Sequence, residues 1–449
     1  AAISQSTVAR MTTDQIAALS TTQVAALTTK QIVMLTSAQV GALSLDDIEV
    51  LSTSQLTVLG TLAMTGLSSD QISTLSSSQL AVLTTKQIAS LTSTQIESLT
   101  TDTLALLSTT QIAAISVTGV TGFTSKQLSS LTTAQVAAFV PTQVAAMKSD
   151  QLAGLDTQAL ATFSTQDMAA ITASAIQGIA TEVLATLTTN QIAALNTLAI
   201  SGLTTSQVDV LTSSQLAALG TRQVAALKSD QLAVLNTSDL AALTTTQIAA
   251  ISSSALAGLS TKQMVALSSA QLEALTPTQV GALSSDQLSV LDATALAVFS
   301  TKDMAAITST AIAGLTTGTL AGLSTEQIAA ISTKGITGLT TGQLDSLTSA
   351  EMEALTSSQV GALSSTQLAV LDAADIATFS TKDIAAIGSD SISALSTAAI
   401  AALSTEQIAA LSTAGIQGLS TRQVVALTTA QIESMTTTQF AALSSRQVA

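Results

Sequence analysis

The acidic side chains are the groups in this chain whose types could do chemistry. They include two close pairs and three aspartates that each follow a phenylalanine: Asp46 with Asp47, Glu351 with Glu353, and Asp167, Asp303 and Asp383. Catalysis by carboxylates or calcium binding would require several oxygens that converge, and calcium loops also contain a turn led by glycine. The sequence shows no such grouping. We therefore predict that these carboxylates are solvated groups in the first turns of helices, where they favour the helix dipole and the cap amides.

Most of the side chains that enzymes use are missing. The chain has no Cys, His, Trp or Tyr, so the usual thiol nucleophiles, imidazole proton shuttles and soft metal ligands are absent. We expect no enzyme activity, no catalytic or metal site and no cofactor. The formal net charge of −15 disfavours binding to nucleic acid. No apolar run approaches the roughly 18 residues of a membrane span, so we expect no such span.

The chain is an unbroken series of eight-residue repeats. Read from Ile3, it divides into 55 complete octads and a final seven residues, 443–449, without insertion or deletion. A typical octad is L-S-T-T-Q-V-A-A at Leu19–Ala26. Positions 1 and 6 are always large apolar residues and never carry a charge. These two columns are the predicted core.

The other positions predict where each helix begins. Position 2 is Ser, Thr, Asp, Asn or Gly except at Val140, Lys148, Ala180 and Lys228, which is typical of an N-cap column. Position 5 is Gln in 33 of 56 octads, so most octads contain the capping box S/T-x-x-Q. The only two prolines, Pro141 and Pro277, both occupy position 3, the expected first helical residue. Ten of the 13 basic residues occupy position 4, which should face solvent.

Two other architectures were weighed against a short helix in every octad. One continuous helix needs an apolar period near 3.6, and a period of eight would wind the apolar stripe around it. A β-solenoid would suit the Thr doublets, but the alanines and capping boxes oppose it. We predict an all-α solenoid in which positions 3 to 9 form a helix of about two turns, as one array over residues 1–449. Such helices are too short to persist alone, so stacking must order them.

Small and polar positions suggest how the octads meet. Ten of the 21 glycines fall at position 8, for instance Gly122, Gly258 and Gly418, and they would let neighbouring turns approach closely. The Gln at position 5 could cap its own helix or form an amide ladder between turns, and capping is the simpler interpretation. The Ser/Thr columns could present hydroxyls to ice, a glycan or a mineral, although capping already explains position 2.

A longer rhythm lies above the octad. Leu283–Ile307 nearly recurs 80 residues later, and Phe163–Met168 recurs after 136, both whole numbers of octads. Octads without Gln at position 5 also recur at regular spacings. This rhythm indicates either a lateral contact face or duplicated blocks, with duplication favoured. The chain has no initiator Met or signal peptide and stops within an octad at Ala449, so we expect a processed or partial chain whose end octads meet further repeats or another subunit.

Two family resemblances follow from the octads. The segment Leu275–Val280, L-T-P-T-Q-V, resembles the opening of the repeats in transcription-activator-like effectors, which bind DNA. That family has repeats about four times longer with a second helix and a base-reading loop, which are absent here, and the acidic charge opposes phosphate binding. The run Leu403–Leu411 is similar to the tandem repeats of large bacterial surface or exported proteins, often called adhesins. This second resemblance spans the chain and implies a structural role at the cell surface.

The sequence thus favours a structural protein over a binding module. We expect an exported bacterial solenoid that forms an extracellular filament, sheath or stalk by stacking and self-association. The alternative is a surface module that binds a glycan, ice or a partner protein through its Ser/Thr/Gln columns.

Overall fold

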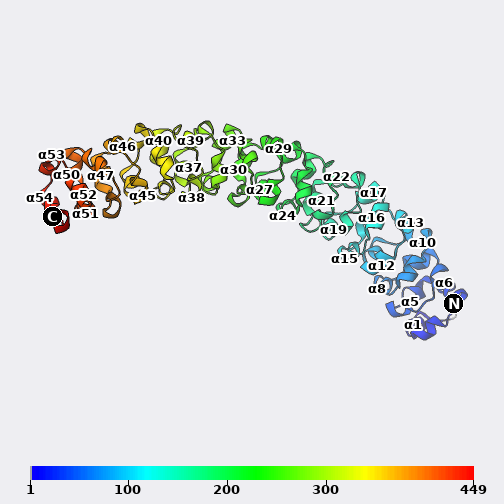
Figure 1. Cartoon of the computed structure of the whole chain (residues 1–449). Helices are drawn as coiled ribbons and strands as arrows, with labels where there is room; N and C mark the ends of the chain where they lie inside the picture. Colours follow the sequence, from blue (N-terminus) through cyan, green and yellow to red (C-terminus); the bar gives the residue numbers. More distant parts are fainter. Residues whose placement is uncertain (1–2, 449) are drawn as a thin grey trace. The chain divides into compact units, whose positions relative to one another are not determined.

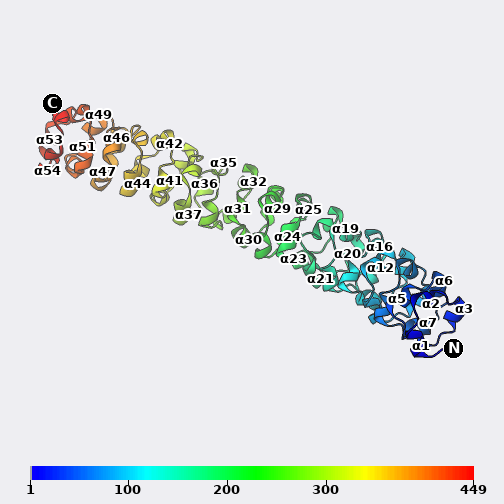
Figure 2. The ribbon, with the colours of Figure 1, turned by 90° about the horizontal axis from the view of Figure 1, so that it is seen from below.

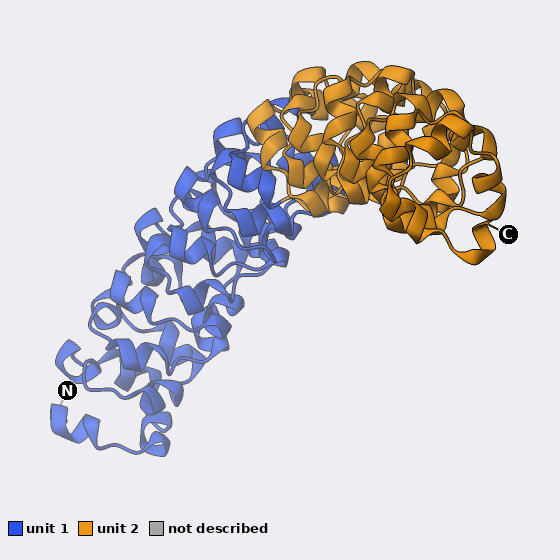
Figure 3. Cartoon of the chain, turned by 90° about the vertical axis from the view of Figure 1, so that its left-hand side faces the viewer, with its two compact units in different colours: residues 1–226 blue, residues 227–449 orange. Residues whose placement is uncertain are grey.

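The computed structural model describes residues 3–448 of the chain. These residues form two compact units, residues 1–226 and residues 227–449, coloured separately in Figure 3. In both units the described residues are helices and short connections, without a strand, so the β-solenoid alternative was wrong. The predicted all-α solenoid of short helices is confirmed. Its extent as one array over residues 1–449 stays a prediction, and Ala449 lies outside the described residues.

Unit 1 contains one short helix in each octad. Its elements are α1 Gln5–Ala9, α2 Thr13–Ala17, α3 Thr21–Ala25, α4 Thr29–Ile32, α5 Ser37–Gly41, α6 Leu45–Glu49, α7 Thr53–Thr57, α8 Thr61–Met64, α9 Ser69–Ser73, α10 Ser77–Ala81, α11 Thr85–Ala89, α12 Ser93–Ser98, α13 Thr101–Ala105, α14 Thr109–Ala114, α15 Val117–Val120, α16 Ser125–Ser130, α17 Thr133–Val136, α18 Pro141–Val144, α19 Ser149–Leu152, α20 Thr157–Leu160, α21 Thr165–Ala170, the 3₁₀ turn η1 Ile176–Gly178, α22 Thr181–Leu184, α23 Thr189–Ala194, α24 Thr197–Gly202, α25 Thr205–Asp209, α26 Ser213–Ala217 and α27 Thr221–Ala225.

Unit 2 repeats the same element. Its helices are α28 Ser229–Ala233, α29 Thr237–Ala242, α30 Thr245–Ala250, α31 Ser253–Leu256, α32 Thr261–Val265, α33 Ser269–Glu273, α34 Pro277–Val280, α35 Ser285–Ser289, α36 Ala293–Leu296, α37 Thr301–Ala306, α38 Ser309–Ile312, α39 Thr317–Leu320, α40 Thr325–Ala330, α41 Thr333–Ile336, α42 Thr341–Asp345, α43 Ser349–Glu353, α44 Ser357–Ala362, α45 Ser365–Leu368, α46 Ala373–Thr378, α47 Thr381–Ala386, α48 Ser389–Ile392, α49 Thr397–Ala401, α50 Thr405–Ala410, α51 Thr413–Gly418, α52 Thr421–Val425, α53 Thr429–Ser434, α54 Thr437–Ala442 and α55 Ser445–Val448.

Each α-helix begins where the sequence predicts and ends earlier, whereas η1 begins later in its octad, at Ile176. The first helical residue is position 3, and both prolines occupy it in α18 and α34. The helices have four to six residues rather than seven. They stop before the next position 1 because that residue is extended, as at Ile115 with φ −57° and ψ 131°. Position 2 is also extended, as at Ser116 with φ −65° and ψ 157°. Two extended residues therefore turn the chain between helices and let position 1 point into the core.

The helices follow one another as coils around a common axis within each unit, as Figures 1 and 2 show. Each helix packs against the third one along the chain, for example α1 against α4, α18 against α21 and α44 against α47. Hydrogen bonds also reach from one octad to the octad four earlier, as from Gln39 to Val8. One coil therefore takes between three and four octads, which the octad pattern alone did not reveal.

The two predicted core columns fill the interior. Position 6 side chains such as Ile72 and Ile88 are completely buried, and position 1 side chains such as Leu75 and Leu91 are 4% and 2% exposed. Burial of large aliphatic side chains is worth about 1.5–3 kcal/mol each, so two per octad supply the force that holds helices too short to be stable alone.

Small residues at position 8 bring successive coils together, as predicted. A Cβ atom added to Gly122 or Gly338 would overlap the backbone of Ser93 or Ser309 in the preceding coil. Neither glycine has a positive φ, so close approach, and not backbone conformation, explains the residue type.

Candidate functional site

The contact between successive coils is where the described residues concentrate their polar interactions. The column of Gln side chains at position 5 lies inside this contact, and Gln95 is only 2% exposed. Its Oε1 accepts the backbone N–H of Thr92 at 2.9 Å, which is one half of the capping box. The backbone N–H of Gln95 donates to the Thr92 hydroxyl at 3.3 Å, which is the other half. Both halves agree with the sequence prediction.

The same Gln side chain also joins two coils. The Nε2 of Gln95 donates to the carbonyl oxygens of Met64 and Leu67, at 2.9 and 2.7 Å. These carbonyls belong to positions 6 and 1 at the end of an earlier helix, where carbonyl groups lack an intrahelical partner. Each buried Gln of this kind thus caps the start of its own helix and the end of another. The capping interpretation was right, and the bonds between coils run from the Gln amide to backbone carbonyls rather than from one Gln amide to another.

The capping role of Gln does not depend on the residue at position 2. Val140 and Lys148 have no hydroxyl for a cap, yet their backbone N–H groups donate to the Oε1 atoms of Gln143 and Gln151, both at 2.8 Å. The amides of these two Gln side chains still reach the carbonyls of the earlier coil, as in the bond from Gln151 to Val120 at 2.8 Å. The octads of Val140 and Lys148 therefore keep the tie between coils, whereas that of Ala180 has Val183 at position 5 and no amide to supply one.

Burial of the position 5 carboxylates corrects the prediction that all of them are solvated. Asp47, Asp167, Asp303 and Glu351 are 2 to 6% exposed. One oxygen caps the helix, as where the backbone N–H of Ser164 donates to Asp167 Oδ2 at 2.9 Å. The other oxygen of each has no hydrogen-bond partner. These carboxylates do lie at helix starts and accept the cap amides, as predicted. They are buried because they occupy position 5, where most octads have a buried Gln. The neighbouring carboxylates, such as Asp46 and Glu353, are exposed.

The remaining predicted aspartate has a partner. Asp383 Oδ1 accepts the hydroxyl of Ser357 on the neighbouring helix α44, at 2.8 Å. In the equivalent places opposite Asp167 and Asp303 the chain has Pro141 and Pro277, which have no hydroxyl to donate. The sequence contains this distinction, but only the stacking of one helix on the third along the chain reveals it.

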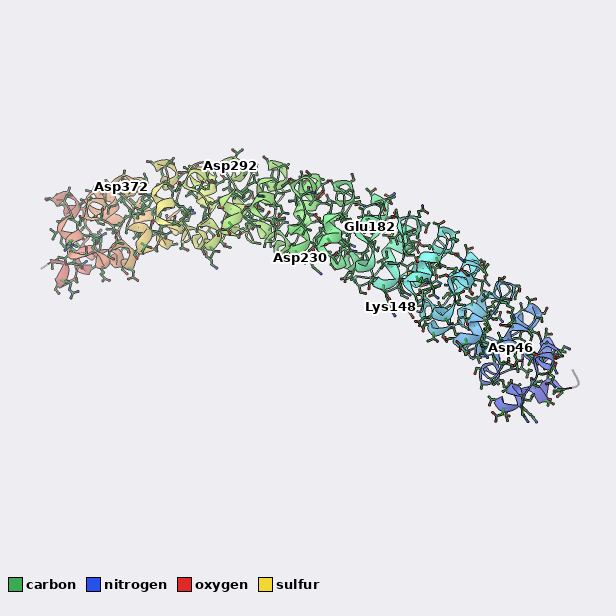
Figure 4. All side chains as sticks on the ribbon, turned by 45° about the vertical axis from the view of Figure 1, so that its right-hand side comes forward. Asp46, Lys148, Glu182, Asp230, Asp292 and Asp372 are labelled. Carbon is green, nitrogen blue, oxygen red and sulfur yellow. The ribbon has the colours of Figure 1, made fainter. Side chains whose placement is uncertain are left out.

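Most other charged side chains lie on the surface, although Asp239 at position 5 is also buried, at 4% exposure. In Figure 4 Asp292 and Asp372 project outward from unit 2, and Lys148 and Glu182 from unit 1. Burial raises the pKa of Asp375 above its ordinary value, and the neighbouring charges of Asp372 and Asp345 add to the rise.

Two exposed glutamates shift in the other direction. A hydrogen bond to its own backbone N–H lowers the pKa of Glu326, and one to Ser324 lowers it further. The pKa of Glu406 falls for the same reasons, with Ser404 in place of Ser324. These shifts follow from the helix starts at which the two residues lie.

No convergent chemistry emerges from these groups. Among residues 3–448 no cluster of three or more acidic side chains could hold a metal ion. Within the same range, no helix is both long and apolar enough to cross a bilayer. The position 5 amides are buried, so they offer no surface column for a ligand, and that part of the binding alternative was wrong. Hydroxyls at position 3, such as those of Thr29 and Thr85, are exposed.

Known protein families contain the same repeat. The family model described as the ALTTAQ repeat matches nine segments of the chain, some of which overlap: residues 8–45, 184–221, 209–237, 232–269, 264–293, 368–405, 384–421, 400–437 and 421–449. Together these matches span just over half of the chain. No curated protein matches it. The recurrence of the family matches agrees with the tandem repetition seen in the octads.

Proposed function

Because this chain belongs to the ALTTAQ repeat family, and its octads are joined coil to coil, we propose that it is a structural element that acts through its length. In this proposal it is an exported bacterial protein that forms an extracellular filament, sheath or stalk on the cell surface by stacking and self-association. The supporting observation is the column of buried Gln amides, which ties each coil to the previous one and carries no reactive group. The similarity of the octads to adhesin-like surface proteins supports the location. The proposal includes no enzyme activity, cofactor or nucleic-acid partner.

The proposed self-association uses contacts like those that join successive coils within the chain. Near residue 3 the Gln15 and Gln23 side chains are exposed, in contrast to the buried Gln residues of later coils. Near residue 448 the position 6 side chains Ile432 and Phe440 are 39% and 49% exposed, whereas most of the same column is buried. The proposed partner is a second copy that docks head to tail and continues the stack.

The test is the state of association of the whole chain. Sedimentation analysis over a range of concentrations should detect end-to-end oligomers, and electron microscopy of the same samples should show rods or fibres. Phe440→Asp should weaken association because it places a charge in the proposed contact. Leu62→Asp is the matched control, since Leu62 is 80% exposed on the side of a coil. A chain that stays monomeric at high concentration, or that responds equally to both substitutions, would contradict self-association.

A second proposal concerns the exposed hydroxyls. Position 3 side chains such as Thr29 and Thr85 recur along the chain and are free of the capping role. We propose, as the alternative function, a surface that binds ice, a glycan or a partner protein through them. Thermal hysteresis and glycan-array binding by the whole chain test it, and the absence of both signals would remove the ice and glycan versions.

A further inference from the structure

Glycine at position 8 coincides with a second change in the same octad. Nine of the ten octads with this glycine have no Gln at position 5, and Gly154 is the exception. Ala63 precedes Gly66 and Ala255 precedes Gly258 in this way. The two changes act on the same contact, because the Gln amide fills the space between two coils and a position 8 side chain would hold them apart. An octad that has neither Gln at position 5 nor a side chain at position 8 therefore lets the two coils approach more closely.

The structure shows this closer approach directly. A Cβ atom on Gly66, Gly178 or Gly314 would overlap the backbone of Ser37, Ser149 or Ser285 in the preceding coil. Since carbon atoms in contact lie about 3.5–4.0 Å apart, the coils at these glycines are about 1 Å closer than an alanine would permit. Octads with alanine at position 8, such as that of Ala138, must keep the wider spacing.

These octads recur on one side of each unit. Gly66, Gly122 and Gly178 are spaced by seven octads, and Gly202 follows after three more. One coil takes between three and four octads, so seven octads correspond to two coils and return to the same side. In Figure 1 the helices of these octads, α8, α15 and α24, follow one edge of unit 1, whereas α10, α13 and α17 follow the other.

Unit 2 repeats the arrangement. Gly258 and Gly314 are seven octads apart, and Gly338 follows after three more. In Figure 1 α38 and α51, which belong to the octads of Gly314 and Gly418, lie on the inner side of the curve that unit 2 makes. Gly322 on α39 lies on the other edge and is the exception.

We infer that this line of glycine octads, the glycine edge, gives each unit a fixed bend. The rise per coil is smaller along the glycine edge than along the opposite edge, so the stack curves toward the glycines. The bend follows from residues within one chain and holds whether or not the chain forms a filament. It adds to the proposed function a direction of curvature that is encoded in the sequence.

The first test measures both edges of the native stack. The chain has no Cys, so pairs of introduced cysteines can carry spin labels without interference. Leu62 and Ser174 are exposed in octads of the glycine edge, and Ser78 and Asn190 are exposed toward the opposite edge, with fourteen octads between the members of each pair. Double electron–electron resonance should give a distance for the first pair that is shorter by about 2 Å, or about 1 Å for each of the two close contacts between the labels, Gly122 with Ser93 and Gly178 with Ser149. Equal distances, or a longer one along the glycine edge, would overturn the inference.

The second test changes the bend. Replacement of Gly66, Gly122, Gly178 and Gly202 by alanine should widen the glycine edge, so that the labelled pair on that edge moves apart. The matched control is the replacement by alanine of Gly60, Gly220, Gly342 and Gly388, where an added Cβ would meet no backbone atom within 4 Å. A folded quadruple variant that keeps the wild-type distances would overturn the inference. If that variant does not fold, the comparison of the two edges in the native chain decides.

Discussion

Two neighbouring stretches of unit 1 build the same coil with different side chains. Residues 123–154 contain four successive octads with Gln at position 5, at Gln127, Gln135, Gln143 and Gln151. Residues 155–186 contain four without it, at Ala159, Asp167, Ala175 and Val183. In the first stretch every Gln bonds to at least two carbonyls of an earlier coil, as from Gln135 to Leu104 and Leu107 at 2.8 and 2.9 Å. In the second stretch no position 5 side chain supplies such a bond.

The comparison separates the residues that form each coil from the residues that join it to its neighbours. Both stretches keep the two apolar columns, and Val136 and Leu160 are equally buried. Both keep the extended residues that separate helices. The second stretch, however, contains η1, where the octad forms a 3₁₀ turn in place of an α-helix. The apolar columns therefore suffice for the coil, and the amides add cohesion between coils and regularity within them.

Loss of a Gln from the first stretch should have the largest effect. In Gln151→Ala the carbonyl of Phe123 loses its donor and the backbone N–H of Lys148 loses its acceptor, while the carbonyl of Val120 keeps the backbone N–H of Phe123 at 3.1 Å. Unsatisfied buried groups cost about 1–3 kcal/mol each, so we expect a loss of about 3 kcal/mol in the free energy of unfolding, measured by urea denaturation. Amide hydrogen exchange should rise in the two coils that Gln151 joins.

The control for this change is Gln23→Ala. Gln23 is exposed and accepts the backbone N–H of Ser20 at 2.8 Å, so its removal tests the cap without a tie between coils. Loss of a cap bond costs about 1 kcal/mol. If the two substitutions destabilise equally, the bonds between coils contribute nothing measurable, and the contrast between the two stretches loses its meaning.

The reverse change should stabilise unit 2. Glu351 Oε2 accepts the backbone N–H and the hydroxyl of Thr348, as a Gln would, but its Oε1 is buried without a partner. In Glu351→Gln an Nε2 donor takes the place of that oxygen, and by the spacing of the other Gln octads the carbonyls of Leu320 and Leu323 are its acceptors. We expect the free energy of unfolding at neutral pH to rise by about 1–3 kcal/mol.

The neighbouring substitution Glu353→Gln serves as the control, because Glu353 is exposed and lies on the same helix. It should change the unfolding free energy by less than about 0.5 kcal/mol, as is usual at the surface. A loss of stability in Glu351→Gln would show that the surroundings of the Glu351 side chain differ from those of the Gln side chains at position 5.

The tie between α44 and α47 offers a smaller test of the same idea. Here a carboxylate replaces Gln, and the hydroxyl of Ser357 donates to Asp383 Oδ1. Ser357→Ala leaves that oxygen without a partner, as it is in Asp167 and Asp303, and should lower the unfolding free energy by about 1–2 kcal/mol in thermal or urea denaturation. Ser309→Ala is the control, since Ser309 is equally half-buried at position 3 and faces no carboxylate in the equivalent place. Equal effects of the two substitutions would contradict the role of the hydroxyl.

Much of the fold followed from the octad because it rests on local chemistry. Pro141 and Pro277 marked the first helical residue correctly, and Ser20 and Gln23 form the predicted capping box. The capping bonds join residues three apart, so the sequence pattern contains them. Helix length was less accurate, because the extended position 1, as at Ile115, is imposed by packing into the core.

The bonds between coils could not be predicted from the octad. Gln39 binds residues 28 and 31 positions earlier, and every octad offers similar carbonyls, so the partner depends on the number of octads in a coil. The same geometry decides that Ser357, and not another hydroxyl, meets Asp383. The burial of Asp167 and Glu351 was missed for this reason too. The residue types at position 5 did indicate burial, because a position that is Gln in most octads and rarely charged is a candidate for burial.

The smallest expected effect concerns a carboxylate whose place in the column is only half-buried. Asp375 lies at position 5 of α46, and burial together with the charges of Asp372 and Asp345 raises its pKa above the ordinary value of 3.8. The folded chain therefore holds this proton more tightly than the unfolded chain. The stability contributed by this proton is present below pH 3.8 and is lost as the pH rises through the raised pKa. An Asn at this position has no such proton to lose. The Asp375→Asn variant should therefore be more stable than the wild type at pH 7 and equally stable near pH 3.

Glu326→Gln should give the opposite sign, which makes the pair of variants a test of burial. The pKa of Glu326 is lowered by a hydrogen bond to its own backbone N–H, so the charged form favours the fold at pH values above 4.5 and this advantage is lost as the pH falls. The Gln variant should therefore be slightly less stable than the wild type at pH 7 and equal to it in acid. Thermal denaturation of both variants between pH 3 and pH 7 measures the two trends. If they run in the same direction, position in the helix start rather than burial in the column governs the acidic groups of this chain.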